Sequence, residues 1–181
     1  RHWLTRNLVA MIESFIPSEI CLACRGCCGF GEQGSVWSPL FLHEEIQRLV
    51  GADIMPACLF SHGDSKQSKA ARIDEVEVDG QFYCPCLDLK TNACRIYPHR
   101  PLDCRLYPFL LLKKDGLAHL ALDMKCPYTQ DPSGARALAA LVPGVMDFLS
   151  TSDAKALLKR NPEIIQAYPG DFKILAPLPL G

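Results

Sequence analysis

The sequence lacks the patterns of several common protein classes. No stretch approaches the roughly 18 consecutive apolar residues that indicate a membrane-spanning helix, and the N-terminus shows no basic–apolar–small signal segment. The net charge is only −1, which gives no general attraction to nucleic acid or to an acidic membrane surface. These features predict a cytoplasmic protein that binds neither nucleic acid nor membrane.

The usual catalytic signatures are missing as well. The five histidines form no HxxxH or HExxH pattern, and the chain contains no GxSxG, P-loop or dinucleotide fingerprint. The CxxxCxxC spacing of radical enzymes that use S-adenosylmethionine is also absent. The residues alone therefore assign no catalytic group and leave open whether the chain is an enzyme.

What the chain has in quantity is cysteine. There are ten among 181 residues, namely Cys21, Cys24, Cys27, Cys28, Cys58, Cys84, Cys86, Cys94, Cys104 and Cys126. Disulfides concentrate in short secreted domains that cannot build a sufficient core. This chain is longer and 49% hydrophobic, so it can bury a core without them. We therefore favour metal binding over disulfides.

The densest group is CLACRGCC at residues 21–28. Two-residue spacing turns the backbone so that amide N–H groups point at the sulfurs, a loop that serves both tetrahedral zinc and iron–sulfur clusters. The first three cysteines have ferredoxin spacing, but Cys28 follows Cys27 directly, so that motif is incomplete. Adjacent side chains usually diverge, so we do not expect this pair to bind one ion together. Cys28 then serves a second centre, supports a ligand, or is a small buried apolar residue.

A second group follows at residues 84–108, CPCLDLKTNACRIYPHRPLDCRLYP. Together the two groups resemble the CxxCxxCC cysteine-cluster family, a YkgJ-like zinc- or iron-chelating domain, over about residues 21–127. The resemblance implies the ligands Cys21, Cys24, Cys27, Cys28, Cys86, Cys94, Cys104 and Cys126. Cys84 is extra to the pattern and a possible substitute for Cys86. Cys58 is also extra, and we expect it in the core.

Family members are described as iron–sulfur proteins, and a similar domain occurs in flagellin lysine N-methylases. The first hypothesis is therefore an iron–sulfur protein, with a 4Fe–4S cluster, a redox or enzyme-accessory role, and a protein or redox partner. The second is a zinc-stabilised protein-interaction module. The third, a protein-modifying methyltransferase, comes from the resemblance alone.

Several thiolates on one centre leave negative charge that cations must offset. Arg100 and Arg105 lie in the resemblance motif and are expected to support the ligands, while Tyr97 and Tyr107 are expected to pack over the site. Arg25 and Arg95 fit either this role or ordinary surface charge.

Periodicity and turn residues predict an α+β fold, a small irregular cysteine-rich domain with short hairpins flanked by helices. Expected helices cover residues 4–16, a segment from Ser38-Pro39 to Gly51, a short turn in 53–60, a short helix that opens at Pro101 and carries Cys104, residues 133–150 with a kink or break at Pro143-Gly144, and 153–160. Expected hairpins turn at Asp79-Gly80 and Asp115-Gly116, and a turn at Thr91-Asn92 is expected to bring Cys86 and Cys94 together. Residues 61–71 form a loop, and the tail from Ala176 is extended. We expect a cysteine-cluster domain at 1–130 and a helical extension at 131–181.

Overall fold

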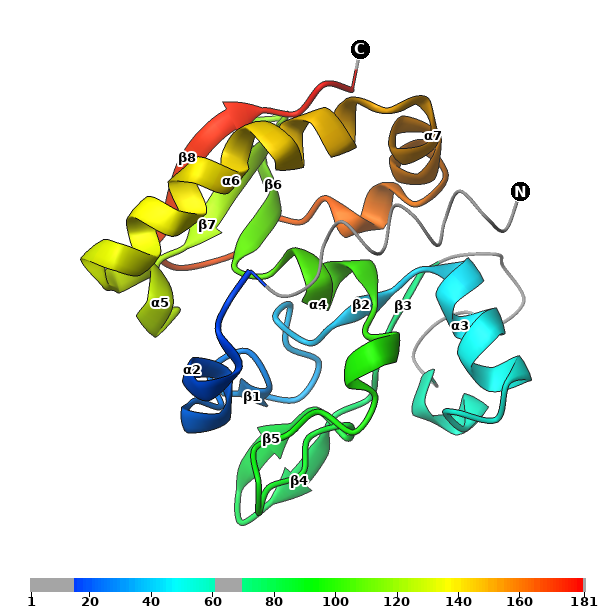
Figure 1. Cartoon of the computed structure of the whole chain (residues 1–181). Coiled ribbons are helices and arrows are strands. Elements are labelled where there is room, and N and C mark those ends of the chain that lie inside the picture. Colours follow the sequence, from blue (N-terminus) through cyan, green and yellow to red (C-terminus); the bar gives the residue numbers. More distant parts are fainter. Residues whose placement is uncertain (1–14, 61–69, 181) are drawn as a thin grey trace. The chain divides into compact units, whose positions relative to one another are not determined.

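The computed structural model describes residues 15–60 and 70–180 (Figure 1) and confirms the α+β class. Most of the helix expected at 4–16 and of the loop expected at 61–71 lies outside these ranges. Among the described residues, contacts group 21–104 into one unit, here the cysteine unit, and 15–20 with 105–180 into another, here the helix–sheet unit. This grouping differs from the boundary expected after residue 130, which stays a prediction.

The cysteine unit contains two small antiparallel sheets. Strands β1 (Gly29–Phe30), β5 (Gln81–Tyr83) and β4 (Val76–Val78) lie in the order β1-β5-β4, while β2 (Leu40–Phe41) pairs with β3 (Ala71–Arg72). The predicted hairpin is confirmed, because β4 and β5 pair on either side of Asp79 and Gly80, whose φ angles are 53° and 75°. Positive φ at both positions suits a tight turn between twisted strands.

Helix α3 (His43–Gly51) begins later than the sequence predicted. Ser38 does not cap it, because this buried hydroxyl donates to the Ile73 carbonyl at 2.9 Å and the next residues enter β2. Glu45 supplies the cap instead, since its Oε2 accepts from the Leu42 N–H at 2.9 Å. The predicted end at Gly51 is confirmed.

Short helical segments carry or flank the cysteines. They are α2 (Ser18–Ala23), the 3-10 turns η1 (Ala57–Phe60) and η2 (Tyr97–His99), and α4 (Leu102–Leu106). The helix expected after Pro101 and the turn expected in 53–60 are thus confirmed. The core of the unit includes Phe41, Leu49 and Ile73, and it also contains Cys84 and Cys86. Two thiols therefore lie in the most protected part of this unit.

The helix–sheet unit has one antiparallel sheet in the order β6-β7-β8, with β6 at Phe109–Lys114, β7 at Leu117–Asp123 and β8 at Phe172–Pro177. The hairpin at Asp115-Gly116 is confirmed, with φ angles of 52° and 77°. The tail, however, forms a strand that starts at Phe172. The sequence did not predict it, because an edge strand is defined by its partner more than by its own residues.

Helices α5 (Pro127–Gln130), α6 (Pro132–Ser150) and α7 (Ser152–Arg160) and the turn η3 (Pro162–Ile164) complete this unit. Helix α6 is not divided at Pro143 (Figure 1). Its N-terminus is capped by Asp131, which accepts from the N–H groups of Ser133 at 2.9 Å and Gly134 at 2.8 Å. Thr151 caps α7 by accepting from the Ala154 N–H at 3.2 Å.

The first turn of α6 tolerates only glycine at position 134. A Cβ atom there would lie 2.1 Å from the Tyr128 carbonyl oxygen, whereas a Cβ at Gly144, farther along the same helix, meets nothing within 4 Å. We expect Gly134→Ala to lower the free energy of unfolding by about 1–3 kcal/mol. Gly144→Ala should instead raise it by up to about 1 kcal/mol. Chemical denaturation of both variants measures the difference, and equal stabilities would contradict the packing described here.

Candidate metal centre

The first cysteine region is a tightly turned loop at the end of α2. The N–H of Cys24 donates to the Cys21 carbonyl at 3.1 Å, and the N–H groups of Cys28 and Gly29 both donate to the Arg25 carbonyl, at 3.0 and 2.8 Å. The Gly26 N–H donates to Cys24 Sγ at 3.2 Å. A Cβ at Gly26 would lie 3.3 Å from the same sulfur. Glycine thus lets the backbone approach a thiol closely.

The second region starts where β5 ends. The Cys86 carbonyl accepts from the Arg95 N–H at 2.8 Å, and Leu87 forms an antiparallel bridge with Cys94. Between them Asp88 and Asn92 close a turn, in which Asn92 has a φ of 58°. The expected turn at Thr91-Asn92, which brings Cys86 and Cys94 together, is confirmed.

Hydrogen bonds of the protein itself join the two regions. The Cys84 N–H donates to the Cys28 carbonyl at 2.9 Å, continuing the pairing of β1 with β5. Arg25 Nε donates to Asn92 Oδ1 at 2.6 Å and its guanidinium also donates to the Leu89 carbonyl at 3.0 Å. Asn92 in turn donates to the Leu22 carbonyl at 2.9 Å. Arg25 is therefore more than ordinary surface charge, because it fastens one cysteine region to the other.

Four thiols from the two regions influence one another electrostatically. Burial raises the pKa of Cys104, and the charges of Asp103, Cys84, Cys27 and Cys94 raise it further. Burial likewise raises the pKa of Cys94, with Cys84 and Cys27 contributing. Each group therefore loses stability on becoming a thiolate unless positive charge is supplied.

The other two of these four thiols, Cys84 and Cys27, are each hydrogen-bonded to a neighbouring thiol. The pKa of Cys84 is raised by its hydrogen bond with the Cys86 thiol and by burial. The pKa of Cys27 is raised by its hydrogen bond with the Cys28 thiol and by burial. As a residue, Cys27 is exposed. We call Cys27, Cys84, Cys94 and Cys104 the thiol set.

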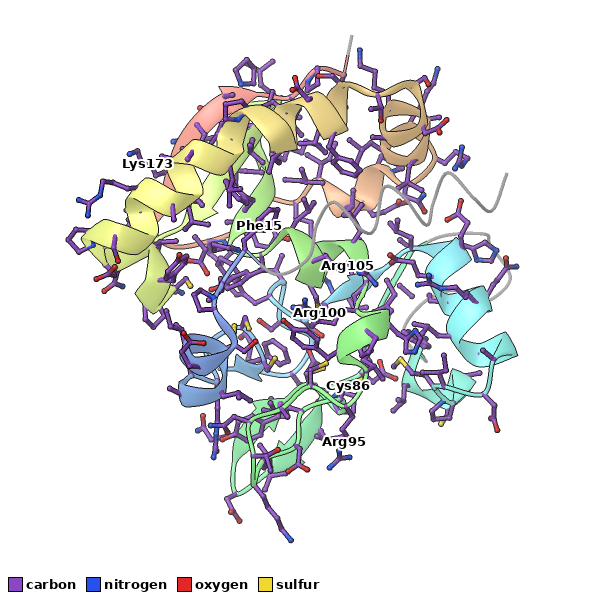
Figure 2. All side chains as sticks on the ribbon, in the orientation of Figure 1. Phe15, Cys86, Arg95, Arg100, Arg105 and Lys173 are labelled. Atoms are coloured by element: carbon purple, nitrogen blue, oxygen red, sulfur yellow. The ribbon has the colours of Figure 1, made fainter. Side chains whose placement is uncertain are left out.

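Backbone amides and one arginine oppose this repulsion. The N–H groups of Ile96 and Cys86 donate to the sulfurs of Cys94 and Cys84 and lower their pKa values. The Arg100 guanidinium lowers the pKa of both Cys27 and Cys94. It lies 3.8 Å from the centre of the Tyr97 ring, and its Nε donates to the Tyr97 carbonyl at 3.2 Å. Figure 2 shows Arg100 and Cys86 with sulfur atoms nearby.

The expectation that Cys27 and Cys28 diverge is wrong. Their sulfurs lie 3.8 Å apart, because the loop curls around the Arg25 carbonyl. This separation is close to that of two sulfurs bound to one zinc ion, roughly 3.8 Å for Zn–S bonds of about 2.3 Å in a tetrahedron. That the pair does not bind one ion together stays a prediction.

Other predicted residues lie elsewhere. Cys58 is exposed and not in the core, since it sits on the outer side of η1. Cys126 is buried, and it belongs with Arg105 and Tyr107 to the helix–sheet unit. The Tyr107 hydroxyl donates to Asp123 Oδ2 at 2.9 Å. The roles of these three at the centre, like the ligand roles of Cys21 and Cys24, stay predictions.

The sequence made Cys84 a possible substitute for Cys86. The structure buries both residues, and the charge of Cys84 raises the pKa of Cys104 and of Cys94. The ligand role of Cys84 stays a prediction.

The donor set fits a thiophilic metal in its chemistry. Soft thiolates, amides directed at sulfur and an adjacent arginine are what zinc and iron–sulfur sites use. In the part of the chain described, no three His, Cys, Asp or Glu side chains are close enough to hold a single ion. The thiols thus share one region without closing on one point.

The chain belongs to the family whose model is named CxxCxxCC and described as "putative zinc- or iron-chelating domain", which matches residues 20–127. It is therefore a metal-binding, cysteine-cluster protein of that family. Neither a curated protein nor a solved structure matches it. Within the described ranges, no helix has the length and apolar character needed to cross a membrane.

The Arg25–Asn92 contact should matter for metal retention. We expect Arg25→Gln to raise the rate of metal loss to a chelator about tenfold, since supporting contacts typically contribute 10–100-fold to affinity. Asn92→Ala should act similarly, and the double variant should lose little more than either single one. Arg48→Gln, an exposed arginine on α3 of the same unit, is the matched control. Additive effects of the two substitutions would contradict a shared role.

Proposed function

We propose that this chain holds an iron–sulfur cluster through thiolates of the cysteine unit and serves in electron transfer or as an accessory to an enzyme. The observation that carries the proposal is the gathering of the thiol set, because the charges of Cys84 and Cys27 raise the pKa of both Cys94 and Cys104. Four thiolates are the ligand set of a 4Fe–4S cluster.

Two further features support it. The spacing of Cys21, Cys24 and Cys27 is that of a ferredoxin loop. Amide N–H groups point at the sulfurs of Cys24, Cys84 and Cys94, and hydrogen bonds to sulfur are one means by which proteins set cluster potentials. When bound, a cluster supplies one-electron chemistry.

The protein residues would have separate tasks. Ligands would come from Cys27, Cys84, Cys94 and Cys104, together with Cys21 and Cys24 of the ferredoxin-type loop, and 4Fe–4S is the expected type. Arg100 would offset negative charge beside Cys27 and Cys94, while Arg25 and Asn92 would keep the two regions together. A protein or redox partner, a cytoplasmic location, and the absence of nucleic-acid and membrane binding belong to the same proposal.

Metal analysis tests the proposal directly. Protein purified without oxygen should be brown and contain iron and acid-labile sulfide in equal, stoichiometric amounts, with visible absorption that bleaches on reduction. A colourless protein with stoichiometric zinc and no sulfide would overturn it. That result would favour the zinc-stabilised interaction module, the alternative that the family description equally allows.

Single cysteine substitutions then test the thiol set. Cys104→Ser and Cys84→Ser should each lower the bound metal to less than half, because each removes one of the proposed ligands. Cys58→Ser, at an exposed cysteine on η1, should retain full metal. Metal content per chain and circular dichroism distinguish ligand loss from unfolding. Full retention in both folded variants would refute the assignment.

A further inference from the structure

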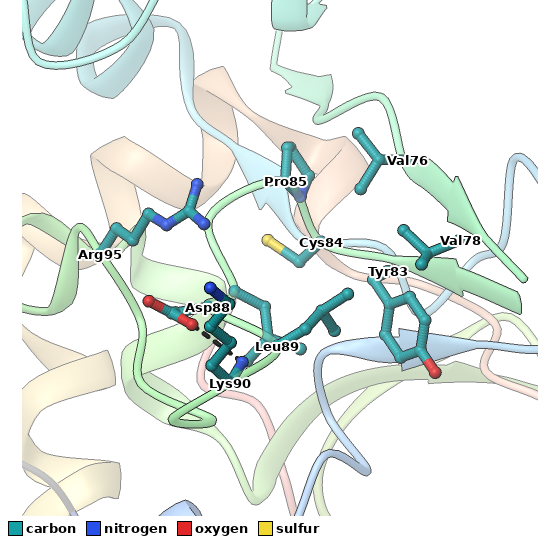
Figure 3. A pocket seen from close by; sticks show the side chains of 10 residues that line it. Val76, Val78, Tyr83, Cys84, Pro85, Asp88, Leu89, Lys90 and Arg95 are labelled. Atoms are coloured by element: carbon teal, nitrogen blue, oxygen red, sulfur yellow. Dashed lines mark hydrogen bonds between the residues drawn. The ribbon is translucent and has the colours of Figure 1, made fainter.

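A cavity of about 440 Å³ lies within the cysteine unit (Figure 3). Its lining residues include Val76, Val78, Cys84, Asp88, Lys90 and Arg95. Small-molecule sites commonly measure about 300–1,000 Å³ and combine apolar walls with a few polar groups. The cavity has both the size and the composition of such a site.

One wall is apolar and incompletely covered. Val76 and Val78 alternate on β4, so their side chains share a face of the strand, and they are 40% and 37% exposed. Leu87 and Leu89 line the cavity from the turn that follows Cys86. An apolar body placed here would remove both valines from water, which is favourable in proportion to the area buried.

The other wall is cationic. Lys90 and Arg95 are exposed and line the cavity together with a single carboxylate, Asp88. That carboxylate already accepts from the N–H groups of Lys90 at 2.9 Å and Thr91 at 3.3 Å, which closes the turn. Two cations against one committed carboxylate leave one unit of positive charge in excess.

We propose that this cavity binds a small organic anion with an apolar body. Arg95 and Lys90 hold the anionic group, and Val76 and Val78 contact the apolar part. The excess positive charge selects against cations, and the apolar wall selects against small hydrated anions such as inorganic phosphate.

The cavity also adjoins the proposed metal centre. Cys84 lines it (Figure 3) and belongs to the thiol set. A bound anion would therefore lie against the edge of the centre and alter its surroundings. This second statement rests on the proposed function, whereas anion binding itself does not.

Calorimetric titration of the metal-loaded full chain tests the binding site. The probes are 8-anilinonaphthalene-1-sulfonate and its neutral analogue N-phenyl-1-naphthylamine, which lacks the sulfonate. Arg95→Gln and Lys90→Gln should each weaken sulfonate binding about tenfold, the effect of losing a charge-assisted contact, and leave the neutral probe within about twofold. Val78→Thr, which keeps the shape and adds a hydroxyl, should weaken both probes.

Arg136→Gln, at an exposed arginine on α6 that does not line the cavity, is the matched control and should change neither affinity. Thermal unfolding of each variant excludes probe binding to partly unfolded protein. Equal affinities of the wild type for both probes, sulfonate binding insensitive to Arg95 and Lys90, or no binding at all would overturn the anion site. Inorganic phosphate competing as well as the sulfonate would overturn the apolar requirement.

A separate measurement tests whether an anion bound in the cavity affects the proposed metal centre. Sulfonate binding should shift the visible spectrum of the iron-loaded protein, or of a cobalt-substituted sample if the native metal is zinc. Binding without a spectral shift would remove the link and leave the anion site. Absence of any bound metal would remove the proposed function, while the same titration of the full chain as purified would still decide the anion site.

Discussion

The repulsion among buried thiols is the constraint on which the cysteine unit depends. Cys84 and Cys104 lie where burial and neighbouring sulfur charge both oppose ionisation, yet thiolates are the form that binds metal. The positive charge of a bound metal ion or cluster would favour the thiolate form of every thiol in the thiol set at once. Arg100 contributes a smaller positive charge permanently, held over Tyr97. Metal affinity and the local packing are therefore parts of one free-energy balance.

Hydrogen bonds within the protein reduce the free energy that metal binding must contribute to bring the two cysteine regions together. Arg25 and Asn92 are 67 positions apart in the sequence and hydrogen-bonded, and the Cys84 N–H reaches the Cys28 carbonyl. These bonds close a long loop, whose entropic cost grows slowly with length but is substantial from the start. Because the pairing of β1 with β5 already offsets this entropic cost, the free energy of metal binding is available to bring the sulfurs together. The Arg25–Asn92 contact thus supports metal affinity by holding the two cysteine regions together.

The sequence predicted best those features that short-range chemistry determines. Both Asp-Gly hairpins were predictable because their turns need positive φ. The predicted helix start at Ser38 was wrong because its hydroxyl donates to the carbonyl of Ile73, 35 positions away. Local sequence patterns do not reveal such a distant partner. The direction of the Cys27 and Cys28 side chains depends on the turn around Arg25, and the exposure of Cys58 depends on which face of η1 packs. Tertiary context decided the partner of Ser38 and the exposure of Cys58, whereas the turn around Arg25 is local.

Charge alone does not distinguish the two candidate metals. A zinc ion with four thiolates and an oxidised 4Fe–4S cluster with four thiolates carry the same net charge of about −2, so Arg100 would serve either. Distance does distinguish them, since zinc needs sulfurs roughly 3.8 Å apart and a cluster needs them farther apart. Cys27 and Cys28 meet the first requirement as a pair, but among the described residues no third donor joins them. A zinc site on that pair would need a third and a fourth sulfur to move towards it, whereas a cluster would need the sulfurs of both cysteine regions at the wider spacing.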